Sequence, residues 1–194
     1  MRWLVVVIAA VLAAAILVPA GGIGASLMLE NQDAFCSACH TEPEATYYQQ
    51  STQSRAVTLA AFHTQNQTAC IDCHSGGGTL GRAEGLQQGA HDLAQYLSGT
   101  YHRPAITTNP LGDDSCAICH ADVFAHAPRG GSRSMNGHYH YYLPQWQAVD
   151  TQAAHCTSCH PAHTQGLESL QFMAQGQVAQ LCDECHTALS GRIR

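Results

Sequence analysis

Residues 36–40 read Cys36-Ser37-Ala38-Cys39-His40, and the same Cys-x-x-Cys-His pattern returns four more times along the chain. The five copies together use all ten cysteines. Their residues are Cys36, Cys39 and His40; Cys70, Cys73 and His74; Cys116, Cys119 and His120; Cys156, Cys159 and His160; and Cys182, Cys185 and His186. Two thiols at this spacing meet the two vinyl groups of one haem as thioethers, and the next residue offers an imidazole to the iron. The sequence therefore predicts five covalently attached haem c groups with five proximal histidines.

Paired cysteines also occur in zinc sites and in redox-active disulfides. A four-cysteine zinc site uses two pairs, and five pairs is an odd number. Every pair here is followed directly by His, although only 13 of the 194 residues are His. These observations favour haem attachment, and they leave no cysteine for a structural disulfide.

The composition indicates how such a chain folds. Beyond residue 29 there are about 33 residues for each motif, too few for a conventional apolar core around each haem. We therefore expect a mainly α fold with long loops, a multihaem cytochrome c fold organised around its five haems. Helices are predicted over residues 42–63, 82–97 and 166–182, with a Gly-rich loop at residues 128–137.

The first 29 residues differ sharply from the rest. Arg2 is the one charge there, and the uncharged run from Trp3 to Leu29 is long enough to cross a bilayer. We expect residues 1–29 to be a transmembrane anchor and residues 30–194 to be the haem domain. A cleaved signal peptide is the alternative, because Val18-Pro19-Ala20 resembles a small-residue cleavage site. Arg2 favours a cytoplasmic N-terminus, a single pass through the cytoplasmic membrane, and a haem domain on the outer, periplasmic side.

The charge of the chain limits its partners. The formal net charge is −6 before the haem propionates are counted, and all eight basic residues are Arg. An acidic surface repels phosphate backbones, so a nucleic-acid partner is not expected.

Eight histidines lie outside the motifs and are candidates for the second axial position of each iron: His63, His91, His102, His126, His138, His140, His155 and His163. A low-spin electron-transfer haem takes a second strong ligand, most simply another imidazole. We expect His63, His163, His102, His140 and His126 to be the distal ligands. If His138-Tyr139-His140 is extended, both imidazoles point the same way, and His140 is the preferred ligand of the two.

Several features together resemble the NapC/NirT family. They are the N-terminal anchor, the short spacer, the stretch Glu30–His40 that contains the first motif, and a His upstream of the second motif. The resemblance implies a membrane-anchored multihaem quinol dehydrogenase whose first haem lies beside a quinol site. It extends from residue 1 to about residue 120.

The chain departs from the familiar members of that family in three ways. They have four haems in this module, several carry Met two residues after the first haem-binding His, and their quinol site contains a Lys. Here there are five motifs, Glu42 follows Thr41, and there is no lysine. By position after the second motif, the resemblance implies a quinol site among Arg82, Glu84, His91 and Asp92. The haem count is similar to that of the pentahaem, single-helix subunit of alternative complex III.

The expected function is an electron relay from quinol or menaquinol, through the haem chain, to a redox partner protein outside the membrane. Quinol oxidation also releases protons, and Glu30, Asp33, Glu42 and Asp92 are candidate acceptors by position. One alternative is the cytochrome subunit of a larger quinol-oxidising complex, or a homo-oligomer. Others are a multihaem reductase, with a pocket near Tyr139–Trp146, and a filament of stacked haems.

Overall fold

The computed structural model describes residues 2–39, 42–106, 110–125 and 137–191. Within these ranges the chain forms helices and loops, with no β-strand. The elements are α1 (Arg2–Leu29), α2 (Asp33–Cys39), α3 (Glu44–Ser51), α4 (Leu59–Gln65), α5 (Cys70–His74), α6 (Gly78–Ser98), α7 (Asp113–His120), the 3-10 helix η1 (Ala121–Phe124), α8 (His138–Gln147), α9 (Cys156–Cys159), the 3-10 helix η2 (Glu168–Leu170) and α10 (Gln175–Leu189). The mainly α fold with long loops is confirmed.

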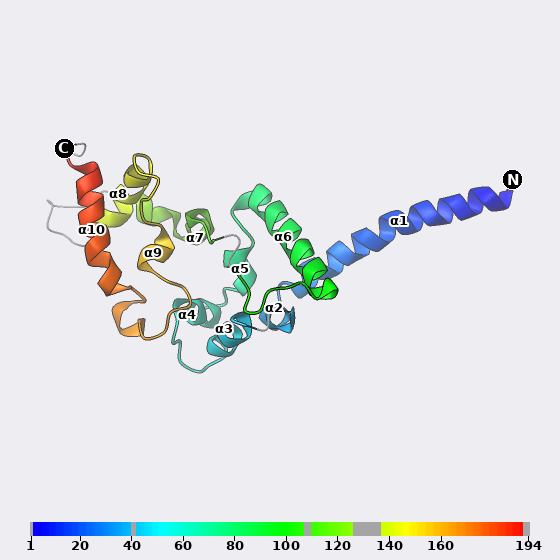
Figure 1. Cartoon of the computed structure of the whole chain (residues 1–194), viewed down its shortest axis with the longest axis horizontal. Coiled ribbons are helices and arrows are strands. Elements are labelled where there is room, and N and C mark those ends of the chain that lie inside the picture. The colour runs from blue at the N-terminus through cyan, green and yellow to red at the C-terminus, as the bar shows by residue number, and fades with distance from the viewer. Residues whose placement is uncertain (1, 40–41, 107–109, 126–136, 192–194) are drawn as a thin grey trace.

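Helix α1 extends away from the other elements; α2 and α6 lie toward its end of the molecule, and α10 lies at the opposite end (Figure 1). The helix has 28 residues, a stretch of 18 within it has a mean hydropathy of 2.8, and its apolar side chains are exposed. At 1.5 Å per residue the helix is about 42 Å long, which exceeds a hydrocarbon core of about 30 Å. Helix α1 is therefore long and apolar enough to cross a membrane.

The predicted helix over 42–63 is wrong as a single element, because it is divided into α3 and α4. Helix α3 ends at Ser51, and Thr58 starts α4 as its N-cap, accepting the N–H of Ala61 on Oγ1 at 3.1 Å. Such a cap satisfies an amide that would otherwise lack a partner in the first turn. Thr58 is 1% exposed, so this start is fixed inside the structure.

The second predicted helix, 82–97, is confirmed within α6. The third, 166–182, begins later than expected, because α10 starts at Gln175. Gln171 and Phe172 just before it have φ values of 53° and 58°, a left-handed conformation that interrupts a right-handed helix. Most of the predicted loop 128–137 lies outside the described residues.

Buried apolar side chains are few among the described residues. The largest group is Trp146, Ala153, Ala154 and Leu189, which joins α8 to α10. A second contact pairs Phe62 of α4 with Phe172, with ring centroids 5.6 Å apart. The motif helices line the rest of the interior, and the candidate site residues lie along it.

Candidate haem sites

Among the described motifs, the second, third and fifth each occupy about one turn of helix, whereas in the fourth His160 follows the helix as its C-cap. The second motif forms α5, the third lies in α7, the fourth begins with α9, and the fifth lies in the middle of α10. Residues three and four apart share one face of a helix, so in the second, third and fifth motifs both cysteines and the histidine face the same side. This local geometry presents two sulfurs and one imidazole together.

A continuous cavity of about 2850 Å³ connects these faces. It reaches one or both cysteines of every motif, from Cys36 to Cys185. Its wall also contains apolar side chains such as Leu59, Phe172 and Leu181. An apolar lining with a few convergent polar groups is typical of a cofactor site.

Four motif imidazoles each face a second imidazole from another part of the chain. The ring centroids are 6.2 Å apart for His74 and His163, 6.1 Å for His120 and His63, 6.4 Å for His160 and His140, and 6.4 Å for His186 and His138. Two imidazoles on opposite sides of one metal ion, at the usual metal–nitrogen distance of about 2 Å, have their centroids roughly 6 Å apart. The four pairs therefore have the separation that six-coordinate haem iron requires.

The relative orientation of the rings divides the pairs into two classes. The planes are 22° apart in the His74–His163 pair and 21° in the His160–His140 pair. In the other two pairs, His120–His63 and His186–His138, they are 83° and 79° apart. Near-parallel and near-perpendicular pairs thus alternate along the sequence of motifs.

Neighbouring groups hold several of these rings in a state suited to binding a metal. The Nδ1 of His63 lies 3.0 Å from the carbonyl oxygen of Leu59, so a proton on Nδ1 leaves Nε2 free for a metal. His163 stacks on Tyr47, with centroids 4.0 Å apart and an interplanar angle of 11°. Burial, together with a smaller effect of the nearby His74, lowers the pKa of His163 to about 4.

Three more rings of these pairs are shifted in the same direction. Burial lowers the pKa of His74, although the charge of Glu44 opposes the shift. Burial also lowers the pKa of His140 and of His160. A metal ligand must be a neutral imidazole, so these environments suit ligation.

Of the predicted distal ligands, His63, His140 and His163 meet a motif imidazole. His102 lines the cavity but faces no motif imidazole among the described residues. His126 and the proximal His40 lie outside the described residues. Of the remaining histidines, His91 is exposed beside Asp92 and His155 contacts Asp113.

The preference for His140 over His138 is wrong in its premise. The segment is the first turn of α8 rather than extended chain, so the two side chains lie about 200° apart around the helix. Each therefore meets the imidazole of a different motif. The signal that sequence reasoning missed was the apolar and aromatic run that continues from His138 to Trp146 as a helix.

The predicted quinol-site residues lie on α6, near the end of α1. Arg82 forms a part-buried ion pair with Glu30, which follows directly after α1. Asp92 accepts a hydrogen bond from Gln88 at 2.8 Å, and its carboxylate is 3.6 Å from Nδ1 of His91. Glu30, His91 and Asp92 line the same cavity as Cys36, whereas Arg82 does not.

The apolar N-terminal helix, the motif turns and the paired imidazoles define a membrane-anchored multihaem cytochrome with covalently bound haem c. Residues 2–79 match the model of the NapC/NirT cytochrome c family, N-terminal region, and this part of the chain is of the NapC/NirT type. Comparisons with curated proteins and with solved structures gave no match. The family places the chain in electron transfer.

Proposed function

We propose that this protein is a single-pass, pentahaem c-type cytochrome that takes electrons from quinol at the membrane and passes them to an acceptor on the outer side. The observation that carries the proposal is the set of four imidazole pairs at 6.1–6.4 Å, each joining a motif histidine to a distant one. When bound, the haems supply one-electron redox centres whose potentials depend on ligation and burial.

The proposed ligand assignment follows from these pairs. His74 is paired with His163, His120 with His63, His160 with His140, and His186 with His138. All ten motif cysteines form thioethers. For the first motif we propose His102 as the second ligand of the iron held by His40. In support, the amide of Ala105 donates to the carbonyl oxygen of Glu42 at 2.9 Å, which brings the segment after His102 beside the residue that follows Thr41.

The order of the elements supports a relay. The motif helices succeed one another along the long axis, from α2 beside the membrane helix to α10 at the opposite end (Figure 1). Arg2 favours a cytoplasmic N-terminus, which leaves the haem domain outside. An electron entering beside the anchor would therefore leave far from the membrane, where a redox partner protein can reach it.

Two carboxylates at the membrane end are placed to accept the protons that quinol oxidation releases. Asp92 and Glu30 line the cavity near Cys36, and a carboxylate within hydrogen-bond reach of a quinol hydroxyl can accept its proton. Gln88 holds Asp92 in place, and Arg82 holds Glu30. We propose that Asp92 is the proton acceptor, with His91 beside it and Arg82 as a positioning residue.

A reductase acting on a small substrate would need an iron with an open side. The paired imidazoles argue against this at four of the five motifs. Two of the aromatic residues of α8 near His138, Tyr142 and Trp146, belong to the packing between α8 and α10.

The test is anaerobic mixing of the oxidised, detergent-purified protein with a menaquinol analogue while the haem absorbance is followed. Rapid reduction by the analogue, slowed in Asp92→Asn and unchanged in Asp183→Asn at the distant α10, would support the proposal. Full reduction by dithionite with none by the quinol would instead indicate a relay subunit of a larger complex, whose quinol site lies on a partner.

A further inference from the structure

Two aspartates occupy equivalent positions in the chain. Asp33 is three residues before the first cysteine of the first motif, and Asp113 is three residues before that of the third. Each is also the first residue of its motif helix, α2 for Asp33 and α7 for Asp113. The other three motifs have Gln67, Ala153 and Ala179 at this position.

Both carboxylates contact the following motif in the same way. Oδ1 of Asp33 accepts the backbone N–H of Cys70 at 2.8 Å, and Oδ1 of Asp113 accepts the backbone N–H of Cys156 at 2.7 Å. The partners are 37 and 43 residues apart in sequence. In each case the amide belongs to the first cysteine of the second or fourth motif, and it survives thioether formation because only the sulfur reacts.

The helix boundaries explain why the contact recurs at alternate motifs. Helices α5 and α9 begin at Cys70 and Cys156, so these amides have no carbonyl partner within their own helices. Cys116 and Cys182 lie inside α7 and α10, beyond the first three residues, where helical carbonyls take up the amides. A carboxylate from a neighbouring motif can therefore bind the second and fourth motifs in this way, but not the third and fifth.

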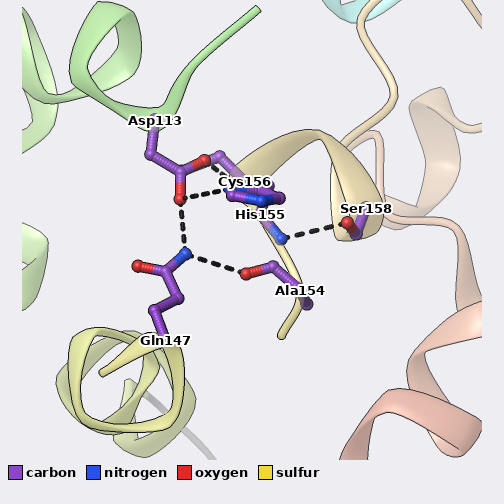
Figure 2. A network of polar contacts seen from close by, with 6 residues as sticks. All are labelled: Asp113, Gln147, Ala154, His155, Cys156 and Ser158. Atoms are coloured by element: carbon purple, nitrogen blue, oxygen red, sulfur yellow. Dashed lines mark hydrogen bonds and ion pairs between the residues drawn. The ribbon is translucent and has the colours of Figure 1, made fainter. Parts of the chain in front are cut away.

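At Asp113 the contact is part of a larger network (Figure 2). Its Oδ2 accepts a hydrogen bond from Gln147 at 2.6 Å and lies 3.2 Å from Nδ1 of His155, while Gln147 also donates to the carbonyl oxygen of Ala154 at 2.8 Å. Burial would raise the pKa of Asp113, but the hydrogen bonds from Cys156, Gln147 and His155 together outweigh it and lower the pKa. The ends of α7, α8 and α9 thus meet at one ionised carboxylate.

We propose that Asp33 and Asp113 are positioning residues that fasten the motifs in two pairs, the first to the second and the third to the fourth. Each fixes the backbone at two haem attachment points and places one negative charge near both of them. Such a charge stabilises ferric over ferrous iron at both. This inference rests on the proposed occupation of these motifs by haem.

The test uses the full, haem-loaded chain in detergent, with Asp→Ala and Asp→Asn variants at both positions. The matched control is Asp183→Asn, because Asp183 adjoins Cys182 but has no contact of this kind. Intact mass first gives the haem count. A wild-type count below five would contradict the proposed function, whereas five haems leave the pairing to be tested separately.

Hydrogen exchange followed by mass spectrometry then reports the amide contact. In Asp113→Ala the segment containing Cys156 should exchange about tenfold faster or more, since a hydrogen bond to a charged acceptor is lost. The segment containing Cys70 should be unchanged, and Asp33→Ala should give the converse. Equal exchange in the variant and the wild type would overturn the proposal.

Redox titration measures the effect of each aspartate's charge on the haem midpoint potentials. Asp113→Asn and Asp33→Asn should each raise two of the five midpoint potentials, a different two in each variant, while Asp183→Asn raises one at most. If each variant moved a single potential, or the same set of potentials, the pairing would be wrong. If the Asp113 variants do not accumulate as folded protein, the same measurements on Asp33→Asn still test the proposal.

Discussion

Replacing His163 by Ala should convert one haem, the one attached at Cys70 and Cys73, from two imidazole ligands to one. The structure sets the size of the effect. His74 and His163 form one of two near-parallel pairs, at 22° and 21°, against two near-perpendicular pairs at 83° and 79°. The variant should therefore lose one haem equivalent of low-spin iron, which is half of the signal from those two near-parallel pairs.

The assay is electron paramagnetic resonance of the fully oxidised protein. The angle between two axial imidazole planes sets the splitting of the iron d orbitals, so parallel and perpendicular pairs give low-spin signals of different anisotropy. His163→Ala should reduce the more rhombic class and add a high-spin signal. Added imidazole should reverse both changes, because it can occupy the space of the deleted ring beside Tyr47.

His63→Ala is the matched control, since it removes a ligand from a near-perpendicular pair. It should reduce the highly anisotropic class and leave the rhombic one intact. The assignment of His163 and His63 to different haems would be wrong if both variants reduced the same class, or if His163→Ala retained all its low-spin iron with five haems bound.

Thr58→Ala should lower the free energy of unfolding by about 1 kcal/mol more than Thr58→Ser does in a thermal melt, because both variants lose the buried methyl group but only Ala also loses the α4 cap. Trp146→Ala should lower it by about 3–5 kcal/mol, because Trp146 is 3% exposed in the contact between α8 and α10; a melting temperature equal to wild type would contradict this. Arg82→Gln should change stability by no more than about 1 kcal/mol, since its ion pair with Glu30 is partly exposed. It should nevertheless slow reduction by a menaquinol analogue in stopped flow, and an unchanged rate would remove Arg82 from the quinol site.

Features that depend on local sequence could be predicted from it. The motifs, the apolar N-terminal helix and α6 each carry their signal within a few turns of chain. His63 and His163 could also be proposed, because a motif follows or precedes each within seven residues. Their partners could not be assigned, since His163 meets the motif histidine His74 from 89 residues away.

The missed features depend on contacts that no local pattern records. The helix predicted over residues 166–182 is interrupted at Gln171 and Phe172, whose backbone is left-handed. Phe172 is buried against Phe62, and that contact offsets the energetic cost of the left-handed backbone. The helix from His138 begins after Gly137, whose φ of 93° suits glycine and redirects the chain. The bonds from Asp33 and Asp113 join side chain to backbone across long stretches, so only the folded arrangement reveals the repeat.

Helix α8 links the last two motifs, because it supplies an imidazole to each of them. One helix offers His138 to the fifth motif and His140 to the fourth, on opposite sides, so any rotation of α8 would displace both imidazoles in opposite directions. Trp146 and Leu143, further along α8, pack against α10, which carries the fifth motif itself. Because α8 packs on α10 through Trp146 and also presents both imidazoles, a weaker contact at Trp146 would displace the ligands of both the fourth and the fifth motif. The end of the chain where electrons would leave is thus held by one shared helix, whereas the membrane end relies on contacts from separate segments.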